Sequence, residues 1–165
     1  MRTVLPGLVL SVLLCGSATR ALADATADGR AVSDAFAKAV AAGDVAAVLA
    51  LYRDDASVIW PGQGEEAKGR AAIEPLVRNL IAQAKNGSIV LESQESTPLG
   101  DGYIVNVGRW ENTMTGPGGR KTVIVIRTSE VLAKTDGKWL YLVDHASVGL
   151  PPPPPARARR RRTRR

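Results

Sequence analysis

Three side chains are the candidates for moving a proton or donating a hydrogen bond to a substrate: Tyr52, Glu130 and His145. His145 is the only histidine, and an imidazole is the side chain best suited to proton transfer near neutral pH. If the three side chains meet in one cavity, His145 would be the base and Tyr52 or Glu130 the hydrogen donor. Such a set would suit a lyase or isomerase that acts next to a carbonyl.

The role of His145 depends on the strand predicted around it. Strict alternation along residues 139–148 places His145 on the same face as Tyr141, Val143 and Ser147. If that face is concave, His145 and Ser147 line a pocket, and His145 acts as a base or anchors a ligand. The alternative is a half-buried histidine bonded to a neighbouring hydroxyl or carboxylate, with no catalytic role.

Glu130 and Tyr52 each have a functional and a structural interpretation. Glu130 shares a strand face with Ile126 and Leu132, where burial would raise the pKa of its carboxyl group, although exposure at a sheet edge explains it equally well. Tyr52 ends an apolar stripe of helical spacing that starts at Val45. Its hydroxyl could point into a cavity, but a tyrosine in such a stripe is more often part of the core.

The charge of the chain is unevenly distributed. The formal net charge is +6, yet seven of the 22 basic residues follow Pro155 and two precede Ala21, which leaves 13 basic against 16 acidic residues. The basic character therefore belongs to the C-terminal tail and gives no reason to expect nucleic-acid binding by the domain. The tail would attach to an anionic surface, such as phospholipid or a cell-wall polymer, or it has no partner.

The two ends of the sequence are typical of segments outside the folded domain. Residues 1–23 read as a signal peptide, with a basic start, an apolar run and the small-x-small site Ala21-Leu22-Ala23, which predicts a secreted or periplasmic protein. A domain over residues 24–150 then precedes a proline spacer and arginine-rich tail, residues 151–165. Cleavage removes Cys15, the only cysteine, so we expect no disulfide, and a single histidine makes a multi-histidine metal site impossible. No metal or cofactor is expected.

Hydrophobic periodicity changes along the domain. Helical spacing predicts helices over residues 25–42, 45–52 and 73–84, with a short strand at 58–60. Strand-like runs then follow, separated by three turns rich in glycine: residues 89–97, 103–113, 122–133 and 139–148. Helices first and hairpins after predict an α+β domain, with three N-terminal helices packed on one face of a curved antiparallel sheet.

Several short motifs in this order resemble the nuclear transport factor 2-like superfamily, and within it the SnoaL-like proteins and ketosteroid isomerases. The motifs are Gly43-Asp44, Leu51-Tyr52-Arg53-Asp54-Asp55-Ala56, Pro61-Gly62, Gly69-Arg70-Ala71-Ala72-Ile73, Asp136-Gly137-Lys138-Trp139 and Asp144-His145-Ala146-Ser147. The resemblance implies a cone-shaped, cystatin-like fold with an apolar pocket at its open end. It also implies a homodimer that forms through the sheet.

The resemblance does not carry over the isomerase mechanism. Ketosteroid isomerase uses an aspartate base with a tyrosine and a protonated aspartate as an oxyanion hole. The position of the base holds Trp60 and that of the tyrosine holds Phe36, while the second donor aligns to Ser129 or Glu130. Two of the three roles are therefore lost. Phe36, Trp60 and Trp110 are instead expected to line the pocket as a wall for a flat ligand, or simply to pack.

These observations leave three functional hypotheses. The main one is an exported domain that binds a small, largely apolar or amphipathic molecule in its cone. The second is the lyase or isomerase with His145 as base. The third is a dimeric interaction domain that presents the arginine tail. The second requires His145 and Glu130 to face one cavity.

Overall fold

The computed structural model describes residues 10–62 and 66–149. The first nine residues of the predicted signal peptide and the predicted tail lie outside this range. The helices are α1 (Leu10–Ala42), α2 (Val45–Leu49) and α3 (Arg70–Ala84), with a short 3-10 turn, η1 (Pro117–Gly119). The strands are β1 (Tyr52–Ile59), β2 (Ala67–Lys68), β3 (Gly87–Leu99), β4 (Tyr103–Thr115), β5 (Lys121–Thr135) and β6 (Lys138–Val148).

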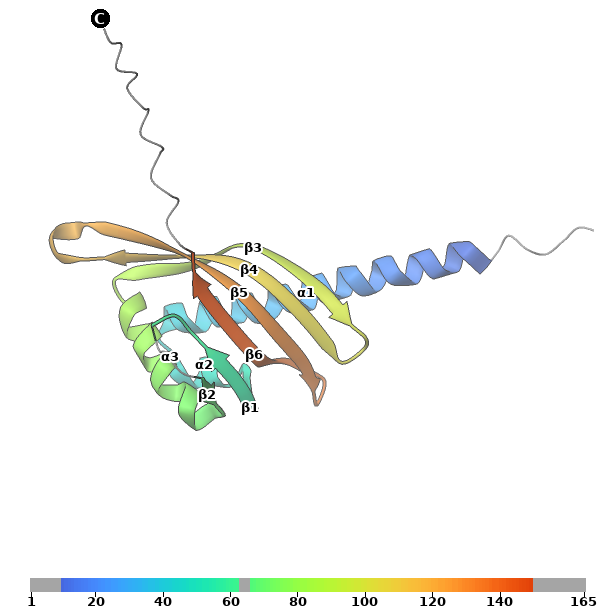
Figure 1. Cartoon of the computed structure of the whole chain (residues 1–165), viewed down its shortest axis with the longest axis horizontal. Coiled ribbons are helices and arrows are strands. Elements are labelled where there is room, and N and C mark those ends of the chain that lie inside the picture. Colours follow the sequence, from blue (N-terminus) through green and yellow to red (C-terminus); the bar gives the residue numbers. More distant parts are fainter. Residues whose placement is uncertain (1–9, 63–65, 150–165) are drawn as a thin grey trace, which may run out of the picture.

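The six strands form one sheet in the order β2-β1-β6-β5-β4-β3. All neighbouring strands are antiparallel except β1 and β6, which are parallel. The sheet bends over the C-terminal half of α1, and α2 and α3 lie near the short strands at one end (Figure 1). The predicted fold class, an α+β domain with N-terminal helices on a curved sheet, is confirmed, although the sheet is mixed rather than purely antiparallel.

The second helix, α2, ends earlier than the apolar stripe predicts. Asp44 caps α2, accepting a hydrogen bond from Ala47 N at 2.9 Å, but the helix ends at Leu49. Tyr52 begins β1 instead of ending the helix. Strand alternation holds over residues 56–59, where Ala56 and Val58 are buried, but it is interrupted at Asp54 and Asp55, which are both exposed, by a register shift against β6. The predicted strand at residues 58–60 is thus the end of a longer one.

Helix α1 also differs from its predicted extent. It begins at Leu10, well before the predicted start at residue 25, and its N-terminal part projects past the end of the sheet (Figure 1). Among residues 20–24 every side chain is exposed, and Ala25, which follows them, is buried. No helix in the described ranges is long and apolar enough to cross a membrane.

The core lies between α1 and the concave face of the sheet. Phe36 of α1 is at its centre, where its ring makes edge-on contacts with the rings of Trp60, Trp110 and Tyr141, at centroid distances of 6.3, 5.9 and 6.2 Å. Burial of one such ring stabilises the fold by about 1.5–3 kcal/mol. One face of this aromatic cluster packs against the core, and the other borders a cavity.

Candidate functional site

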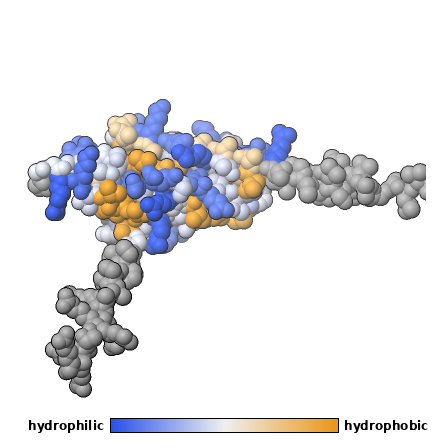
Figure 2. Space-filling model, turned by 90° about the horizontal axis from the view of Figure 1, so that it is seen from above, coloured by the Kyte–Doolittle hydropathy of each residue, from blue (hydrophilic) through white to orange (hydrophobic). Residues whose placement is uncertain are grey.

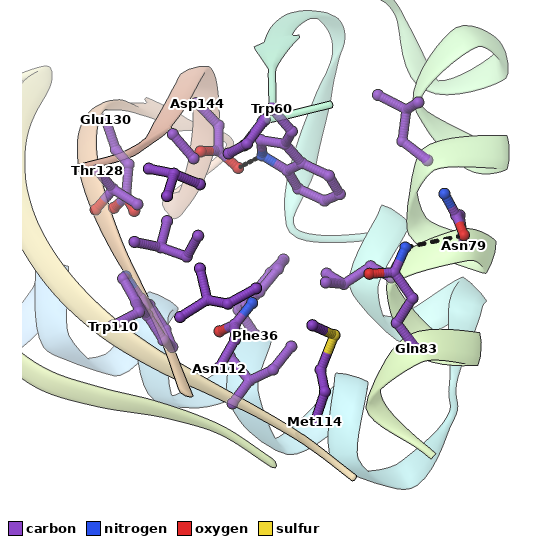
Figure 3. A pocket seen from close by; sticks show the side chains of 18 of the residues that line it. Phe36, Trp60, Asn79, Gln83, Trp110, Asn112, Met114, Thr128, Glu130 and Asp144 are labelled. Atoms are coloured by element: carbon purple, nitrogen blue, oxygen red, sulfur yellow. Dashed lines mark hydrogen bonds between the residues drawn. The ribbon is translucent and has the colours of Figure 1, made fainter. Parts of the chain in front are cut away.

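A cavity of about 190 Å³ opens at the end of the cone, between α1, α3 and strands β4 to β6 (Figure 3). Its walls are mainly apolar, and three of the predicted pocket residues, Phe36, Trp60 and Trp110, line it without filling it. The remaining lining residues are Pro61, Leu76, Asn79, Leu80, Gln83, Ile89, Asn112, Met114, Ile124, Ile126, Thr128, Glu130, Tyr141, Asp144, Ala146 and Val148.

Two carboxyl groups lie side by side in this cavity. Glu130 of β5 and Asp144 of β6 are directly opposite each other in the strand ladder, and they are only 3% and 5% exposed. Asp144 Oδ2 accepts hydrogen bonds from Tyr52 Oη at 2.7 Å and from Trp60 Nε1 at 2.9 Å. The bond from Trp60 is visible in Figure 3. Glu130 Oε2 accepts a longer bond, 3.4 Å, from Asn106 Nδ2.

The environment of the two carboxyls favours one shared proton. Burial raises the pKa of Glu130 from 4.5 to about 8, and the nearby Asp144 adds to the rise, while the neighbouring Thr128 hydroxyl and the hydrogen bond from Asn106 oppose it. The Thr128 Oγ1 atom is itself buried without a hydrogen-bond partner of good geometry among the described residues. Burial also raises the pKa of Asp144, but the strong hydrogen bonds from Tyr52 and Trp60 oppose that rise. The two short hydrogen bonds that Asp144 accepts favour the negative charge on Asp144, so a single proton held by the pair is favoured on Glu130, which accepts only the longer bond from Asn106.

His145 does not reach the cavity, so its predicted place in the pocket is wrong. The β5–β6 ladder shifts register between the pairs Val131–Val143 and Leu132–Tyr141, which inserts one extra residue into β6. Beyond this bulge, the side chains of β6 therefore point to the opposite face from the one that simple alternation from Tyr141 predicts.

The reversal turns Asp144 inward and His145 outward, opposite Ser129, where His145 is exposed. Ser147 has the same outward parity as His145 and does not line the cavity. His145 and Glu130 thus point to opposite faces of the sheet. A reaction with His145 as base and Glu130 as donor in one cavity is excluded.

Tyr52 supports the site without lining it. Its side chain is fully buried, and its ring lies 5.0 Å from that of Tyr141. Burial raises the pKa of both tyrosines well above the usual range, so they stay protonated. Tyr52 therefore acts as a fixed hydrogen-bond donor to Asp144, and a direct catalytic role is not supported by its position.

Sequence reasoning missed the polar side chains other than Glu130 that line the cavity: Asn79, Gln83, Asn112, Thr128 and Asp144. Asp144 was recognised only as part of a motif, because the bulge that turns it inward leaves no mark in the periodicity. Asn112 of β4 has a buried Oδ1 without a hydrogen-bond partner among the described residues. The cavity thus offers an acid hydrogen, a carboxylate and a free amide oxygen within apolar walls. In the described ranges no group of three or more His, Cys, Asp or Glu side chains could hold a metal ion.

A curved sheet wrapped around a long helix, with an apolar cavity at the open end, defines a nuclear transport factor 2-like fold. The chain belongs to the SnoaL-like domain family, whose sequence profile matches residues 30–151. No significant match was found among curated proteins.

Solved structures of similar proteins share this fold. A Xanthomonas campestris protein provisionally named a calcium/calmodulin dependent protein kinase II association domain is 27% identical, with a TM-score of 0.66 over 73% of this chain and 84% of that one. A Streptomyces avermitilis protein provisionally named a dehydratase of the NTF2-like family is 17% identical, with a TM-score of 0.69 over 79% and 99%. A ketosteroid isomerase-like protein from Erwinia carotovora atroseptica is 22% identical, with a TM-score of 0.63 over 76% and 96%.

Proposed function

We propose that this domain binds a small, largely apolar molecule in the cavity at the end of the cone. The observation that carries the proposal is the lining: aromatic and aliphatic walls converge on two buried carboxyls, the unpaired amide oxygen of Asn112 and the unpaired hydroxyl of Thr128. Few well-placed polar groups in an apolar pocket are typical of small-molecule sites. A cavity of about 150 Å³ holds benzene, so one of about 190 Å³ suits a single substituted ring.

The proposal is tested by ligand-observed NMR with a panel of neutral one-ring compounds. Ala146 lines the cavity and Ala82 is exposed on α3, so Ala146→Phe and Ala82→Phe add the same ring inside and outside the site. We expect binding to the wild type and to Ala82→Phe, and its loss in Ala146→Phe, with circular dichroism confirming that both variants fold. Failure of every compound to bind the wild type at millimolar concentration would refute the proposal.

The second candidate function is a lyase or isomerase that acts next to a carbonyl, with Glu130 and Asp144 in place of His145. It is favoured because one carboxyl of the pair is held protonated and the other ionised, and two neighbouring groups in different protonation states are a common arrangement for an acid and a base. The names of the Streptomyces and Erwinia proteins, a dehydratase and an isomerase-like protein, are consistent with such chemistry on this fold.

This candidate has a test that needs no natural substrate. Cyclohexanone exchanges its α-protons for deuterium in D₂O, and a base that acts next to a carbonyl would accelerate that exchange. We expect wild-type acceleration that Asp144→Asn removes and His145→Ala retains. Exchange at the buffer rate with the wild type would leave only the binding function.

We further propose that the protein is exported, with cleavage after Ala23. All side chains of residues 20–24 are exposed, so the cut would fall in an exposed stretch of α1, just before the buried Ala25. N-terminal sequencing of the protein recovered from the cell envelope or medium tests this. A chain that still begins at Met1 would contradict it.

We also propose a homodimer through the outer face of the sheet. Val107 is 55% exposed there, between its cross-strand neighbours Glu95 of β3 and Ser129 of β5. Seen from above, the molecule has hydrophobic patches between hydrophilic side chains (Figure 2). The name of the Xanthomonas protein, an association domain, supports an assembling role for the fold. Sedimentation should report a dimer that Val107→Glu dissociates; a wild-type monomer would refute it.

Contact of the arginine tail with anionic surfaces stays a proposal, tested by vesicle retention with and without residues 151–165.

A further inference from the structure

The polar groups that face the cavity are mainly hydrogen-bond acceptors. Glu130 and Asp144 contribute carboxyl groups, and the Asn112 Oδ1 and Thr128 Oγ1 atoms are buried without a partner among the described residues. Thr128 is only 7% exposed and faces the cavity beside Glu130 (Figure 3). Its hydroxyl can donate to Glu130 and still accept from a guest. Because a buried acceptor without a partner is unfavourable, a guest that donates hydrogen bonds would be stabilised here.

The cavity has no basic side chain to balance its carboxyls. Its lining residues, all within the described ranges, include no lysine, arginine or histidine. Neither Glu130 nor Asp144 takes part in an ion pair in the part of the chain that the structure describes. The two groups that hold Asp144 in place, the Tyr52 hydroxyl and the Trp60 indole, are neutral. Buried charges in proteins are normally paired, so the site favours a positive charge that comes from a guest.

The titratable groups around the pair do not supply that charge. Tyr141 of β6 and Tyr52 of β1 stay protonated and neutral. His145 of β6 acts on Asp144 only from the outer face of the sheet, where it is exposed. The residues of α1, α3, β3 and β4 that line the cavity are all uncharged. Burial raises the pKa of both Glu130 and Asp144, so the pair holds a proton in place of a cation.

Aromatic rings form much of the remaining wall. Four of them line the cavity, those of Phe36, Trp60, Trp110 and Tyr141. Aromatic rings attract organic cations through the negative potential of their faces, and they also pack against apolar groups. Carboxyls at one point and rings around them therefore suit a guest that is cationic at one end and apolar at the other.

We propose that the cone selects a small organic cation, in which a primary ammonium group lies at Asp144 and Glu130 and an apolar ring or short chain lies against the aromatic wall. The inference rests on the proposed binding function and names its ligand class. An ammonium group donates hydrogen bonds and accepts none, so it matches the surplus of acceptors in the cavity. An anionic guest, or one that offers only acceptors, is disfavoured.

Binding of such a cation should release a proton. The positive charge favours ionisation of the nearby Glu130, whose pKa burial raises to about 8. Because binding and proton release are linked, the affinity for an amine should rise between pH 5 and pH 9, as long as the amine stays protonated. The affinity for a neutral guest should not rise over this range.

Three one-ring probes test the inference on the full chain by isothermal titration calorimetry in phosphate, a buffer without amines. Benzylamine is a cation with N–H donors, benzyl alcohol is its neutral counterpart, and acetophenone offers only an acceptor. At pH 7 we expect benzylamine to bind about tenfold more tightly than benzyl alcohol, the difference between a charged and a neutral hydrogen bond. In weakly buffered solution, benzylamine binding should lower the pH, and benzyl alcohol binding should not.

The variant Asp144→Asn removes the negative charge and keeps the shape of the side chain. The preference for benzylamine over benzyl alcohol should fall toward one. Asp28→Asn is the matched control, because Asp28 Oδ2 also accepts from a tryptophan, Trp139 Nε1 at 2.8 Å, but lies outside this cavity. It removes the same charge and should leave the preference in place. Glu130→Gln should abolish most of the proton release, and it serves if Asp144→Asn does not fold.

The outcomes separate the two proposals. If the wild type binds none of the probes, the proposed function fails. If it binds benzyl alcohol as tightly as benzylamine, the binding function stands and the inference is overturned. If Asp28→Asn lowers the preference as much as Asp144→Asn does, the amine is attracted by the overall charge or binds elsewhere, and the inference is likewise overturned. Benzylamine binding that releases as much proton in Glu130→Gln as in the wild type would also contradict it.

Discussion

Replacement of Glu130 by glutamine should make the protein more stable, and increasingly so at higher pH. The carboxyl is 3% exposed and has Asp144 as its neighbour, so its ionised form is unfavourable in the folded state. Glutamine has the same shape and cannot ionise. A gain in stability on removal of a polar group from the site is the result expected if this carboxyl is retained for function.

The size of the effect follows from the pKa values. Below pH 4.5 the folded and unfolded chains both carry the proton, so Glu130 causes no loss of stability. Between pH 4.5 and about 8 the unfolded chain ionises first, and the unfolding free energy falls by about 1.4 kcal/mol per pH unit. Above pH 8 the loss is complete, at about 5 kcal/mol.

Urea unfolding followed by circular dichroism at pH 5, 7 and 9 measures this effect. Glu130→Gln should gain about 2–5 kcal/mol at pH 9 and less than about 1 kcal/mol at pH 5. The control is Glu95→Gln, an exposed carboxyl on β3, which should show no such trend. A gain that does not depend on pH, or a loss at pH 9, would refute the placement of a buried proton on Glu130.

Three further substitutions test the supports of the site. Tyr52→Phe removes the 2.7 Å hydrogen bond to Asp144, so the free energy of unfolding in urea should fall by about 1–3 kcal/mol and the pKa of Asp144 should rise. An unchanged free energy of unfolding would contradict this bond. Gly29→Ala should lower the free energy of unfolding by about 1–3 kcal/mol, because the added Cβ would collide with Asn106. In an uncrowded helix the same change would raise stability by about 1 kcal/mol, so a gain in stability would show that α1 lies farther from the sheet. His145→Ala should leave the binding of acetophenone unchanged, and a tenfold loss would return His145 to the site.

The fold could be predicted because several independent signals agree. Helical spacing up to residue 84, strand spacing after it and glycine-rich turns between the strands all indicate helices on a meander. Glu130 was placed on the correct face of β5 because that strand has no irregularity on its β4 side, and alternation along it holds from Ile124 to Leu132.

The errors arose where local pattern and tertiary structure disagree. A bulge in β6 reverses the alternation between Tyr141 and Asp144, and nothing in the residue types there demands a bulge. Because of that one extra residue in β6, Asp144 faces the cavity and His145 does not. Tyr52 fits a helical stripe and a strand equally well, and burial against Tyr141 decides in favour of the strand. The bond from Asn106 to Glu130 joins two strands, so spacing along either one does not reveal it.

The central claim is that a guest molecule lies inside the cone, and the three tryptophan indole N–H groups report on it directly. Trp60 and Trp110 line the cavity, whereas Trp139 lies outside it and donates to Asp28 Oδ2 at 2.8 Å. In ¹H–¹⁵N correlation spectra of the labelled protein titrated with acetophenone, the Trp60 and Trp110 signals should shift together while the Trp139 signal stays in place. Movement of Trp139 alone, or no movement at saturating probe, would contradict the account.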